Sequence, residues 1–251
     1  MAGVEGRVAL VTGAGRGIGK TTTELLSARG ARVMAVSRSE AELEALGVEY
    51  TVADLGTVEG CTLAVEETVK RLGAVAIFVC NHGIGSAHER LIWEQDPDVW
   101  YHTMRINLDG PFHLTRLLLP AMVEQGYGRL VYTSSTAARV AERAGSAYNC
   151  SKHGLLGLMR SVAQDGGPHG ITSNAVLPGW VRTEMAERSA KAEASERGVS
   201  AEEIWEERNA MYLPGRVVTP REVAEVIAFL ASEESGGVSG QAITVALGSE
   251  C

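Results

Sequence analysis

The sequence lacks the marks of a disulfide-stabilised, zinc-binding or membrane-spanning protein. It has no C-x-x-C pair, and its four cysteines are far apart, at Cys61, Cys80, Cys150 and Cys251. Such spacing predicts reduced thiols in a cytoplasmic protein. No segment approaches the roughly 20 apolar residues of a membrane helix, and the first residues lack the apolar stretch of a signal peptide. We therefore expect neither a membrane span nor export.

Basic runs and metal-binding spacings are also missing. The formal net charge is −8, from 23 Lys and Arg against 31 Asp and Glu, and the cations form no long run. Phosphate backbones need clustered cations, so we expect no nucleic-acid partner. The six histidines show neither H-x-H nor H-E-x-x-H spacing, and the serine motif G-x-S-x-G is absent. These absences argue against a metal site, a metal hydrolase and a serine hydrolase.

The sequence does contain a regular alternation of short apolar runs and longer helical patterns. We predict strands over 7–12, 31–37, 48–53, 74–80, 129–134, 171–177 and 241–247, and helices between them that include 17–29 and 57–72. Strands that are apolar on both faces and alternate with helices are typical of a parallel sheet covered on both sides. With no linker or repeat, we expect one α/β domain over 1–251 with a doubly wound parallel sheet.

One segment departs from this alternation. Residues 184–212 are charged and helix-prone, and they follow the end of the predicted strand 171–177. Open α/β sheets bind ligands outside the carboxyl ends of their strands, so an insertion here is well sited to cover a substrate. We expect a lid in which Met185, Trp205 and Met211 could shape an apolar pocket or simply pack the lid. A solvated pair of surface helices is the alternative.

A glycine-rich turn follows the first predicted strand and opens a helix. The stretch GAGRGIGKTT, residues 13–22, ends like the P-loop of nucleoside triphosphatases, but Ala14 stands where a P-loop needs glycine. The fingerprint G-x-G-x-x-G also fails, because its last glycine would fall on Ile18. The spacing that fits is T-G-x-x-x-G-x-G, from Thr12 to Gly19. Such a turn can bring backbone N–H groups and a helix dipole to a pyrophosphate, or it can be a mere tight turn.

Further motifs follow this turn in a recognisable order. Ser135 lies thirteen residues before the tyrosine of a Y-x-x-x-K motif, Tyr148 to Lys152, and Leu177-Pro178-Gly179 follows a late strand. In this combination the chain resembles the short-chain dehydrogenases/reductases over nearly its whole length. The resemblance implies a Rossmann fold, a nicotinamide dinucleotide cofactor and an oxidoreductase that acts on ketones or secondary alcohols.

Four residues make up the catalytic set that the resemblance implies. Tyr148 and Lys152 are four residues apart on a predicted helix, so they share a face. A lysine cation favours a phenolate, which lets Tyr148 take a proton from an alcohol or return one to a ketone. Ser135, which the spacing favours over Ser134, would hydrogen-bond the substrate oxygen. By resemblance, Lys152 also binds the nicotinamide ribose, and the main chain of Asn107 holds a water in a proton relay.

The end of the second predicted strand distinguishes NADP from NAD. Ser37 and Arg38 stand where an NAD-binding fold usually carries an acidic residue for the ribose 2′-hydroxyl. An arginine suits a 2′-phosphate instead, and Arg16 in the glycine turn adds a second cation. We therefore expect NADP(H) as the cofactor.

The resemblance extends the cofactor site along the chain. With Tyr148 and Lys152, it implies contacts with the dinucleotide at Gly13, Gly17, Ile18, Gly19, Asp54, Leu55, Asn81, Gly83, Pro178, Gly179, Val181 and Thr183. Asp54 could instead cap the helix that begins near Thr57. The chain departs from the family pattern in two places. His82 replaces the alanine of Asn-Ala-Gly, after Cys80 in place of a common second asparagine, and residues 245–248 replace a V-D-G-G ending.

Together these features predict an NADP(H)-dependent enzyme that interconverts a small-molecule ketone and a secondary alcohol. Residues 151–154 also resemble polyketide ketoreductases, which suggests secondary metabolism. A 3-ketoacyl-(carrier protein) reductase is the alternative, although the surroundings of Arg129 lack the basic surface that an acidic carrier needs. The complete catalytic set argues against a non-catalytic dinucleotide-binding regulator, and Ala14 argues against a P-loop phosphotransferase. The resemblance implies a homotetramer, or a homodimer, built on helices near 97–125 and 147–165.

Overall fold

A computed structural model describes residues 3–86 and 90–249 of the chain. Its centre is a seven-stranded parallel sheet in the order β3-β2-β1-β4-β5-β6-β7. The strands are β1 Val8–Thr12, β2 Arg32–Ser37, β3 Glu49–Val52, β4 Ile77–Cys80, β5 Gly128–Thr133, β6 Ile171–Pro178 and β7 Ala242–Val245. Every strand that the sequence predicts is present, with ends that shift by up to three residues.

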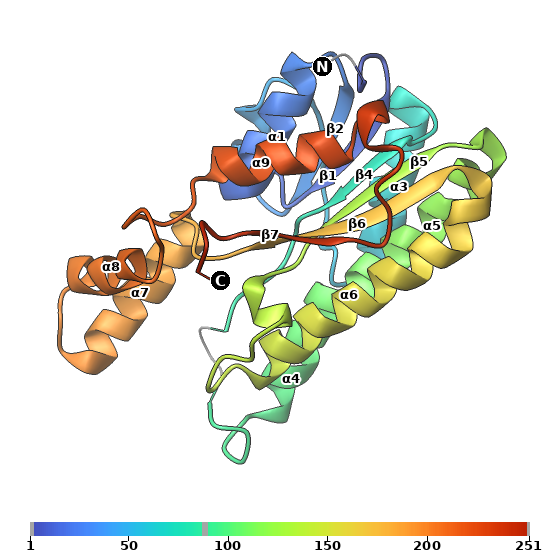
Figure 1. The fold of residues 1–251 in the computed structure, drawn as a ribbon. Helices are drawn as coiled ribbons and strands as arrows, with labels where there is room; N and C mark the ends of the chain where they lie inside the picture. Colours follow the sequence, from blue (N-terminus) through green and yellow to red (C-terminus); the bar gives the residue numbers. More distant parts are fainter. Residues whose placement is uncertain (1–2, 87–89, 250–251) are drawn as a thin grey trace.

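Helices cover both faces of the sheet (Figure 1). They are α1 Gly17–Ala28, α3 Val58–Leu72, α4 Pro97–Met104, α5 Gly110–Gln125, α6 Ser146–Gly166 and α9 Pro220–Leu230. Successive strand residues point to opposite faces, so Ala9 and Val11 of β1 pack with α1 and α9, while Val8 and Leu10 pack with α3, α5 and α6. This confirms the doubly wound α/β fold expected from the sequence.

The segment near 97–125, expected to be helical, contains two helices with an interruption between them. A π-helical turn, Arg105–Asp109, separates α4 from α5, and within it the Gly110 N–H donates to the Arg105 carbonyl. Pro111 supplies a physical reason for the interruption. A proline has no N–H to continue the helical ladder, and its ring crowds the carbonyl four residues earlier.

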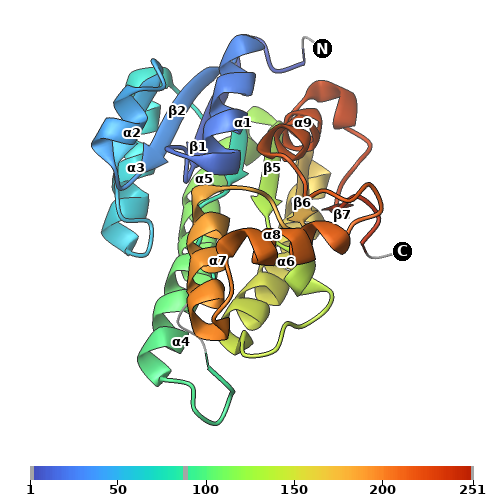
Figure 2. The ribbon, with the colours of Figure 1, turned by 90° about the vertical axis from the view of Figure 1, so that its left-hand side faces the viewer.

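Two shorter segments also differ from the expectation or refine it. A one-turn helix, α2 Glu40–Glu44, joins β2 to β3 and was not expected. Residues 184–212 fold as two helices, α7 Glu184–Arg197 and α8 Ala201–Ala210. Both lie beyond the carboxyl ends of the strands, apart from the helices that cover the sheet (Figures 1 and 2).

The described residues show no membrane-spanning helix, no metal-binding cluster and no disulfide. Within residues 3–86 and 90–249, no helix has the length and apolar character needed to cross a lipid bilayer. The same residues contain no group of three or more His, Cys, Asp or Glu side chains that could hold a metal ion. Cys61, Cys80 and Cys150 are free thiols, and Cys251 lies outside the described residues.

Candidate active site

The site residues expected from the sequence gather at the carboxyl edge of the sheet. Thr12 ends β1, Asn81 follows β4, Ser134 follows β5 and Pro178 ends β6. These four strands are neighbours in the order β1-β4-β5-β6, so their ends lie side by side. The α7–α8 pair lies beyond the same edge (Figure 2). This edge is where parallel α/β sheets bind ligands.

Tyr148 and Lys152 share one face of α6, as their spacing predicts. The Lys152 Nζ lies 5.6 Å from the centroid of the Tyr148 ring, within reach of a cation–π interaction. Lys152 is only 5% exposed, and its Nζ donates a 3.0 Å hydrogen bond to the Thr133 carbonyl. Burial lowers the pKa of Lys152 to about 8, and the nearby Cys80 thiol partly opposes this fall. The amine is therefore mainly a cation at neutral pH and loses its charge at slightly higher pH.

Ser134 and Ser135 have different partners. Ser134 is buried, and its hydroxyl donates to the Lys152 carbonyl at 3.0 Å. Ser135 is partly exposed, and its Oγ accepts from the Ala137 N–H at 3.1 Å. That contact uses an oxygen lone pair and leaves the Ser135 hydroxyl proton for another acceptor. The geometry thus favours Ser135 as the donor to a substrate, in agreement with its spacing from the tyrosine.

The side chain of Asn107 holds the segment after β4 in place. Asn107 is buried in the π-helical turn; its amide accepts from the Ile84 N–H at 2.8 Å and donates to the Ile84 carbonyl at 3.0 Å. It also donates to the Ser151 hydroxyl at 3.1 Å. A Cβ on Gly83 would lie 3.2 Å from the Asn107 Oδ1 and 3.5 Å from the Lys152 Nζ. Glycine at this position lets the segment pack directly against the lysine.

The glycine turn has no room for side chains. A Cβ on Gly19 would overlap the Gly13 carbonyl oxygen, and Gly13 and Gly17 have positive φ angles of 62° and 54°. Ile18 packs against the core, and a Cβ on Gly17 would lie 3.1 Å from the Thr183 Cγ2. Since α1 begins at Gly17, the N–H groups of its first turn point out of the helix toward this edge. The turn therefore fits the pyrophosphate of a dinucleotide.

Thr12 and Asn81 fasten the glycine turn to β4. The buried Thr12 Oγ1 accepts from the Asn81 N–H at 3.0 Å, and the Asn81 side chain donates to the Gly13 carbonyl at 3.3 Å. A Cβ on Gly13 would lie 2.9 Å from the His82 Cα. The sequence assigned no role to Thr12, although it is the first residue of the glycine motif.

The two arginines expected to bind a 2′-phosphate lie on different segments, Arg38 after β2 and Arg16 before α1. Ser37 ends β2, and Arg38 is exposed and forms no ion pair with any residue of the described ranges. Arg16 lies 3.6 Å from a carboxylate oxygen of Glu42 and 3.6 Å from one of Glu184. Glu184 begins α7, so the ion pair of Arg16 joins the glycine turn to the α7–α8 pair.

Asp54 and Leu55 follow β3 as the family pattern requires. The Asp54 carboxylate accepts from the Gly56 N–H at 3.0 Å, which closes a turn. Thr57, and not Asp54, caps α3 through the Gly60 N–H at 3.0 Å. The capping role considered for Asp54 is therefore wrong. The Leu55 side chain is buried in the core, which leaves its main chain to meet a ligand.

The segment after β6 lies beside the glycine turn. Pro178 ends β6, and a Cβ on Gly179 would overlap the Tyr212 hydroxyl. Val181 is buried, and Thr183 caps α7 by accepting from the N–H of its third residue at 3.3 Å. Residues 178–183, which are expected to line the nicotinamide, thus lie between the glycine turn and the α7–α8 pair.

Comparison with known proteins identifies the family. A family model described as enoyl-(acyl carrier protein) reductase matches residues 13–250. The chain is 33% identical to D-β-hydroxybutyrate dehydrogenase from Cupriavidus necator, over 94% of this chain and 95% of that protein. It is also 33% identical to the short-chain reductase protein NovJ from Streptomyces niveus, over 95% and 92% of the two chains. The chain belongs to the short-chain dehydrogenase/reductase family.

Solved structures agree with this assignment. A crystal structure of a variant of actinorhodin polyketide ketoreductase with NADPH matches 96% of both chains, with a TM-score of 0.90 and 33% identity. The family and the fold that the motifs led us to expect are therefore confirmed.

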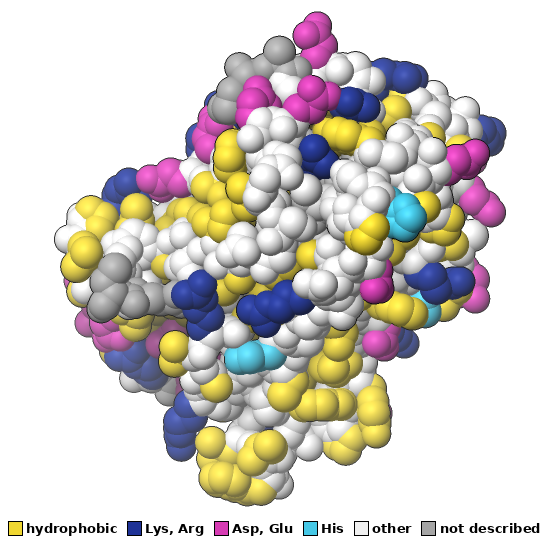
Figure 3. All heavy atoms as spheres, turned by 45° about the vertical axis from the view of Figure 1, so that its right-hand side comes forward, with side chains coloured by type: hydrophobic (Ala, Val, Ile, Leu, Met, Phe, Trp, Pro, Cys, Tyr) yellow, Lys and Arg dark blue, Asp and Glu magenta, His cyan; other side chains and the backbone are white. Residues whose placement is uncertain are grey.

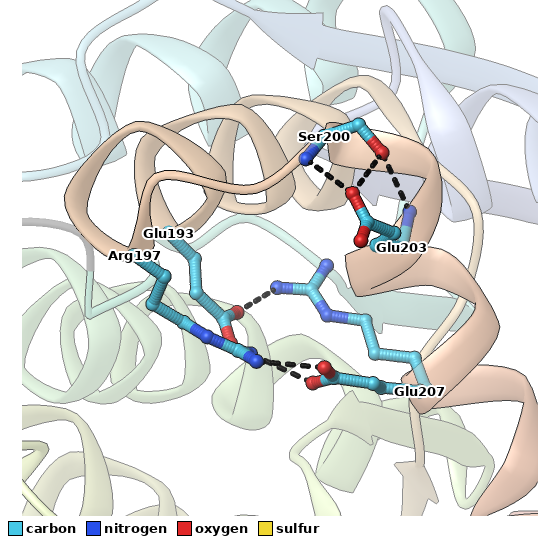
Figure 4. A network of polar contacts seen from close by, with 6 residues as sticks. Glu193, Arg197, Ser200, Glu203 and Glu207 are labelled. Carbon is cyan, nitrogen blue, oxygen red and sulfur yellow. Dashed lines mark hydrogen bonds and ion pairs between the residues drawn. The ribbon is translucent and has the colours of Figure 1, made fainter.

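In this short-chain reductase, charged side chains join α7 to α8. Arg197 of α7 pairs with Glu193 at 3.1 Å and with Glu207 of α8 at 2.6 Å (Figure 4). Arg208 is only 3% exposed, donates to Glu193 at 3.0 Å and lies 3.6 Å from the centroid of a Trp180 ring. The two helices therefore form one packed unit.

The three residues singled out from the segment 184–212 divide into two kinds. Trp205 is buried and its Nε1 donates to Glu187 at 3.0 Å, so it packs α8 against α7 and does not face a pocket. Met185 and Met211 are both exposed. A Cβ on Gly85 would lie 3.6 Å from the Met185 Sδ, so Met185 faces the segment after β4.

Several residues that order this site were missed from the sequence. Ser151 binds Asn107, and Tyr212 packs on Gly179 through its hydroxyl. Pro111, a proline inside a helical run, was an available signal for the π-helical turn. Nothing in the sequence marks Tyr212, because its contact depends on how the end of the α7–α8 pair returns to β6.

Proposed function

We propose that this chain is an NADP(H)-dependent oxidoreductase that interconverts a small-molecule ketone and the corresponding secondary alcohol. The observation that carries the proposal is the convergence of Ser135, Tyr148 and Lys152 at one sheet edge, beside a glycine turn open to a pyrophosphate. A bound nicotinamide supplies the hydride for ketone reduction or accepts it from the alcohol. The names of the similar proteins, a hydroxybutyrate dehydrogenase and a polyketide ketoreductase, support this reaction class.

The side chains have separate roles in the proposed reaction. The Tyr148 hydroxyl moves the proton: it gives it to the carbonyl oxygen in reduction and takes it from the alcohol in oxidation. The Lys152 cation, 5.6 Å from the Tyr148 ring centroid, stabilises the negative charge left on the phenolic oxygen. Ser135 donates to the same substrate oxygen and orients it. Asn107 keeps the segment behind Lys152 in place through its two bonds to Ile84.

NADP(H) is the proposed cofactor because Arg38, and no carboxylate, directly follows β2, and Arg16 stands in the glycine turn. Arg38 is exposed, and the 3.6 Å ion pairs of Arg16 are longer than direct hydrogen bonds, so both guanidinium groups can turn to a 2′-phosphate. We expect Arg38→Asp to raise the KM for NADPH at least about tenfold and to change the KM for NADH less than about twofold. Equal changes for both cofactors would contradict the assignment.

A free small molecule is the proposed substrate, in preference to a carrier-bound acyl group. Arg129 is buried, and its guanidinium donates to the carbonyls of Gly128, Gly170 and Ser232 at 3.0, 3.2 and 3.2 Å. It also lies over the Tyr127 ring. Arg129 is therefore engaged within the fold and unavailable to an acidic carrier. The likeness to a polyketide ketoreductase supports a role in secondary metabolism.

A homotetramer is the proposed assembly, with a homodimer as the alternative. Tyr101 on α4 and Phe112 on α5 are exposed, as are Ile92 and Trp93 just before α4. Figure 3 shows apolar side chains gathered toward the lower end of one face of the molecule. Exposed apolar groups of this kind suit burial against a second copy. A monomer by light scattering would contradict the assembly.

The free thiols support a reducing, cytoplasmic location.

The test of the reaction is an assay of the purified chain with a panel of ketones and secondary alcohols and both cofactors. We expect oxidation of NADPH with at least one ketone, and a loss of about 10³-fold in kcat in Tyr148→Phe. Tyr127→Phe is the matched control, because Tyr127 lies just before β5, at the opposite edge of the sheet, and its hydroxyl has no hydrogen-bond partner among the described residues. Binding of NADPH without turnover of any compound would favour a regulator, and binding of ATP without NADPH would favour a phosphotransferase.

A further inference from the structure

His82 stands where the family resemblance leads us to expect alanine, and the proposed reaction gives it no role. It lies between the end of β1 and the π-helical turn that carries Asn107. Its Nδ1 lies 2.8 Å from the Thr12 Oγ1. Its Nε2 is buried, and no side chain of the described residues bonds it. A Cβ on Gly110 would lie 3.1 Å from this Nε2, so the ring lies directly against the start of α5.

The contacts of Thr12 decide which ring nitrogen carries the proton. The Thr12 hydroxyl oxygen accepts from the N–H groups of Asn81 at 3.0 Å and His82 at 3.3 Å, which occupies both lone pairs. Its own proton goes to the closer acceptor, the His82 Nδ1 at 2.8 Å, and not to the Val79 carbonyl at 3.3 Å. The Cys80 Sγ lies 3.9 Å from the same nitrogen, and because burial raises the pKa of this thiol it keeps its proton and can act as a second donor to Nδ1. Burial and the Lys152 cation lower the pKa of His82 to about 3. The ring is therefore neutral, with its proton on Nε2.

The main chain of Ile106 provides an acceptor for this proton. Ile106 lies one helical turn before Gly110, the residue at which the helix meets the His82 Nε2, and its main chain opposes the fall in the pKa of His82. In a helix, the Ile106 carbonyl would accept from Gly110 or, in π register, from Pro111. The Gly110 N–H donates to the Arg105 carbonyl instead, and Pro111 has no N–H. The buried Nε2–H of His82 thus lies near the Ile106 carbonyl, which has no donor within the helix. A hydrogen bond between them would avoid the cost of leaving both groups buried and unpaired.

We propose that the Nε2–H of His82 donates to the Ile106 carbonyl and so fixes the π-helical turn that carries Asn107. His82 is then a positioning residue, because it acts through Asn107 and does not touch the substrate. The Asn107 amide already joins the turn to Ile84 by bonds of 2.8 and 3.0 Å, and His82 joins the same two segments a second time. The effect on catalysis rests on the proposed function, whereas the hydrogen bond itself does not.

The hydrogen bond is tested by nitrogen-15 NMR of the histidine rings in the full-length protein, with His82→Gln used to assign the signal. We expect His82 to show the Nε2–H tautomer and to keep it unchanged from about pH 5 to about pH 8. A proton on Nδ1, or titration of His82 within this range, would overturn the proposal. This readout needs neither substrate nor cofactor.

The positioning role is tested by three substitutions of His82. For each variant, kcat, the KM for NADPH and the melting temperature are measured. His82→Ala should lower kcat about tenfold and change the KM for NADPH less than about twofold. His82→Gln can present an N–H at the distance of Nε2, so it should recover kcat to within about threefold of the wild type. His82→Asn reaches only as far as Nδ1 and should remain as slow as His82→Ala.

The pair of amide variants separates positioning from general stability. If His82→Gln and His82→Asn have the same kcat, or if kcat follows the melting temperature across all three variants, the positioning role is wrong. If the wild-type protein reduces no ketone, the proposed function fails, and the NMR measurement still decides the hydrogen bond.

Discussion

The helix α6 and the α7–α8 pair carry their charges in opposite ways. On α6, Lys152 is buried, and its Nζ meets the Thr133 carbonyl and the Tyr148 ring; in the described ranges no carboxylate forms an ion pair with it. On the α7–α8 pair, Arg197 contacts two glutamates and is 42% exposed. The first region has a buried cation without a carboxylate partner among the described residues, and the second has many charges in water.

This difference shows that the number of ion pairs does not measure the importance of a region. Exposed pairs contribute little, because water and salt screen them and ordering long side chains costs entropy. A buried cation without a counter-ion lowers stability, so its presence calls for a chemical reason. We therefore expect substitutions on α6 to change the rate, and substitutions in the exposed pairs of α7–α8 to change little.

The largest expected effect is that of Lys152→Met. We expect kcat to fall about 10³-fold, because the cation that stabilises the Tyr148 oxygen is lost. We expect the free energy of unfolding at pH 7 to stay within about 1 kcal/mol or to rise. The pKa of Lys152, lowered from 10.5 to about 8, means that burial disfavours the charged amine by about 3 kcal/mol, which offsets the lost bond to Thr133.

Steady-state kinetics and urea unfolding of the same preparation check this prediction. A loss of more than about 2 kcal/mol in unfolding free energy would make Lys152 a structural residue and would remove the contrast between the two regions.

Arg208→Met sharpens the comparison, because Arg208 is the buried cation of the α7–α8 pair. The substitution keeps the apolar stem but removes the side-chain donor of the Ala186 carbonyl and one of the two cations that contact Glu193, and it removes the guanidinium from the Trp180 ring. We expect a loss of about 2–3 kcal/mol in unfolding free energy, measured in urea. Arg188→Met, at an exposed arginine of α7, is the matched control. Equal stability of the two variants would contradict the role of burial.

The lowered pKa of Lys152 predicts a pH dependence with opposite signs for rate and stability. Between about pH 8 and pH 10.5 the unfolded chain keeps the Lys152 proton and the folded chain does not, so unfolding free energy rises with pH, by up to about 1.4 kcal/mol per unit. The reductive kcat falls over the same range as the cation is lost. The difference between wild type and Lys152→Met, measured from about pH 7 to about pH 10, isolates this group; a flat difference would contradict the assignment.

The sequence predicted those parts of the molecule that depend on local pattern. The strands follow from short apolar runs that alternate with helical patterns, the face shared by Tyr148 and Lys152 follows from the helical period of 3.6 residues, and the glycine turn follows from its spacing and from the resemblance to the family. The spacing also selected Ser135 over Ser134, and the partners of the two hydroxyls agree with that choice.

What the sequence could not predict depends on competition between distant groups. Pro111 marks an interruption of the helical run in the sequence, but the π register depends on the bond from the Gly110 N–H to the Arg105 carbonyl, which the helical pattern does not reveal. Arg129 matched a position of possible carrier contact, yet its guanidinium is used by three carbonyls from separate segments. The register of a helical turn and the burial of an arginine need the tertiary structure, because the neighbouring residues in the sequence do not determine whether a side chain is buried or exposed.

The smallest effect is expected for Arg197→Ala, although Arg197 makes the most complete ion pair of the α7–α8 pair. Its two terminal nitrogens lie 2.7 and 2.6 Å from the two Glu207 oxygens, and Nη1 lies 3.1 Å from Glu193. Because these groups are exposed, we expect the Tm to change by less than about 2 °C at moderate salt and kcat to stay unchanged. Calorimetry at low and high salt checks this. A loss of more than about 5 °C that vanishes at high salt would show that exposed charges hold the two helices together, and the contrast with α6 would then fail.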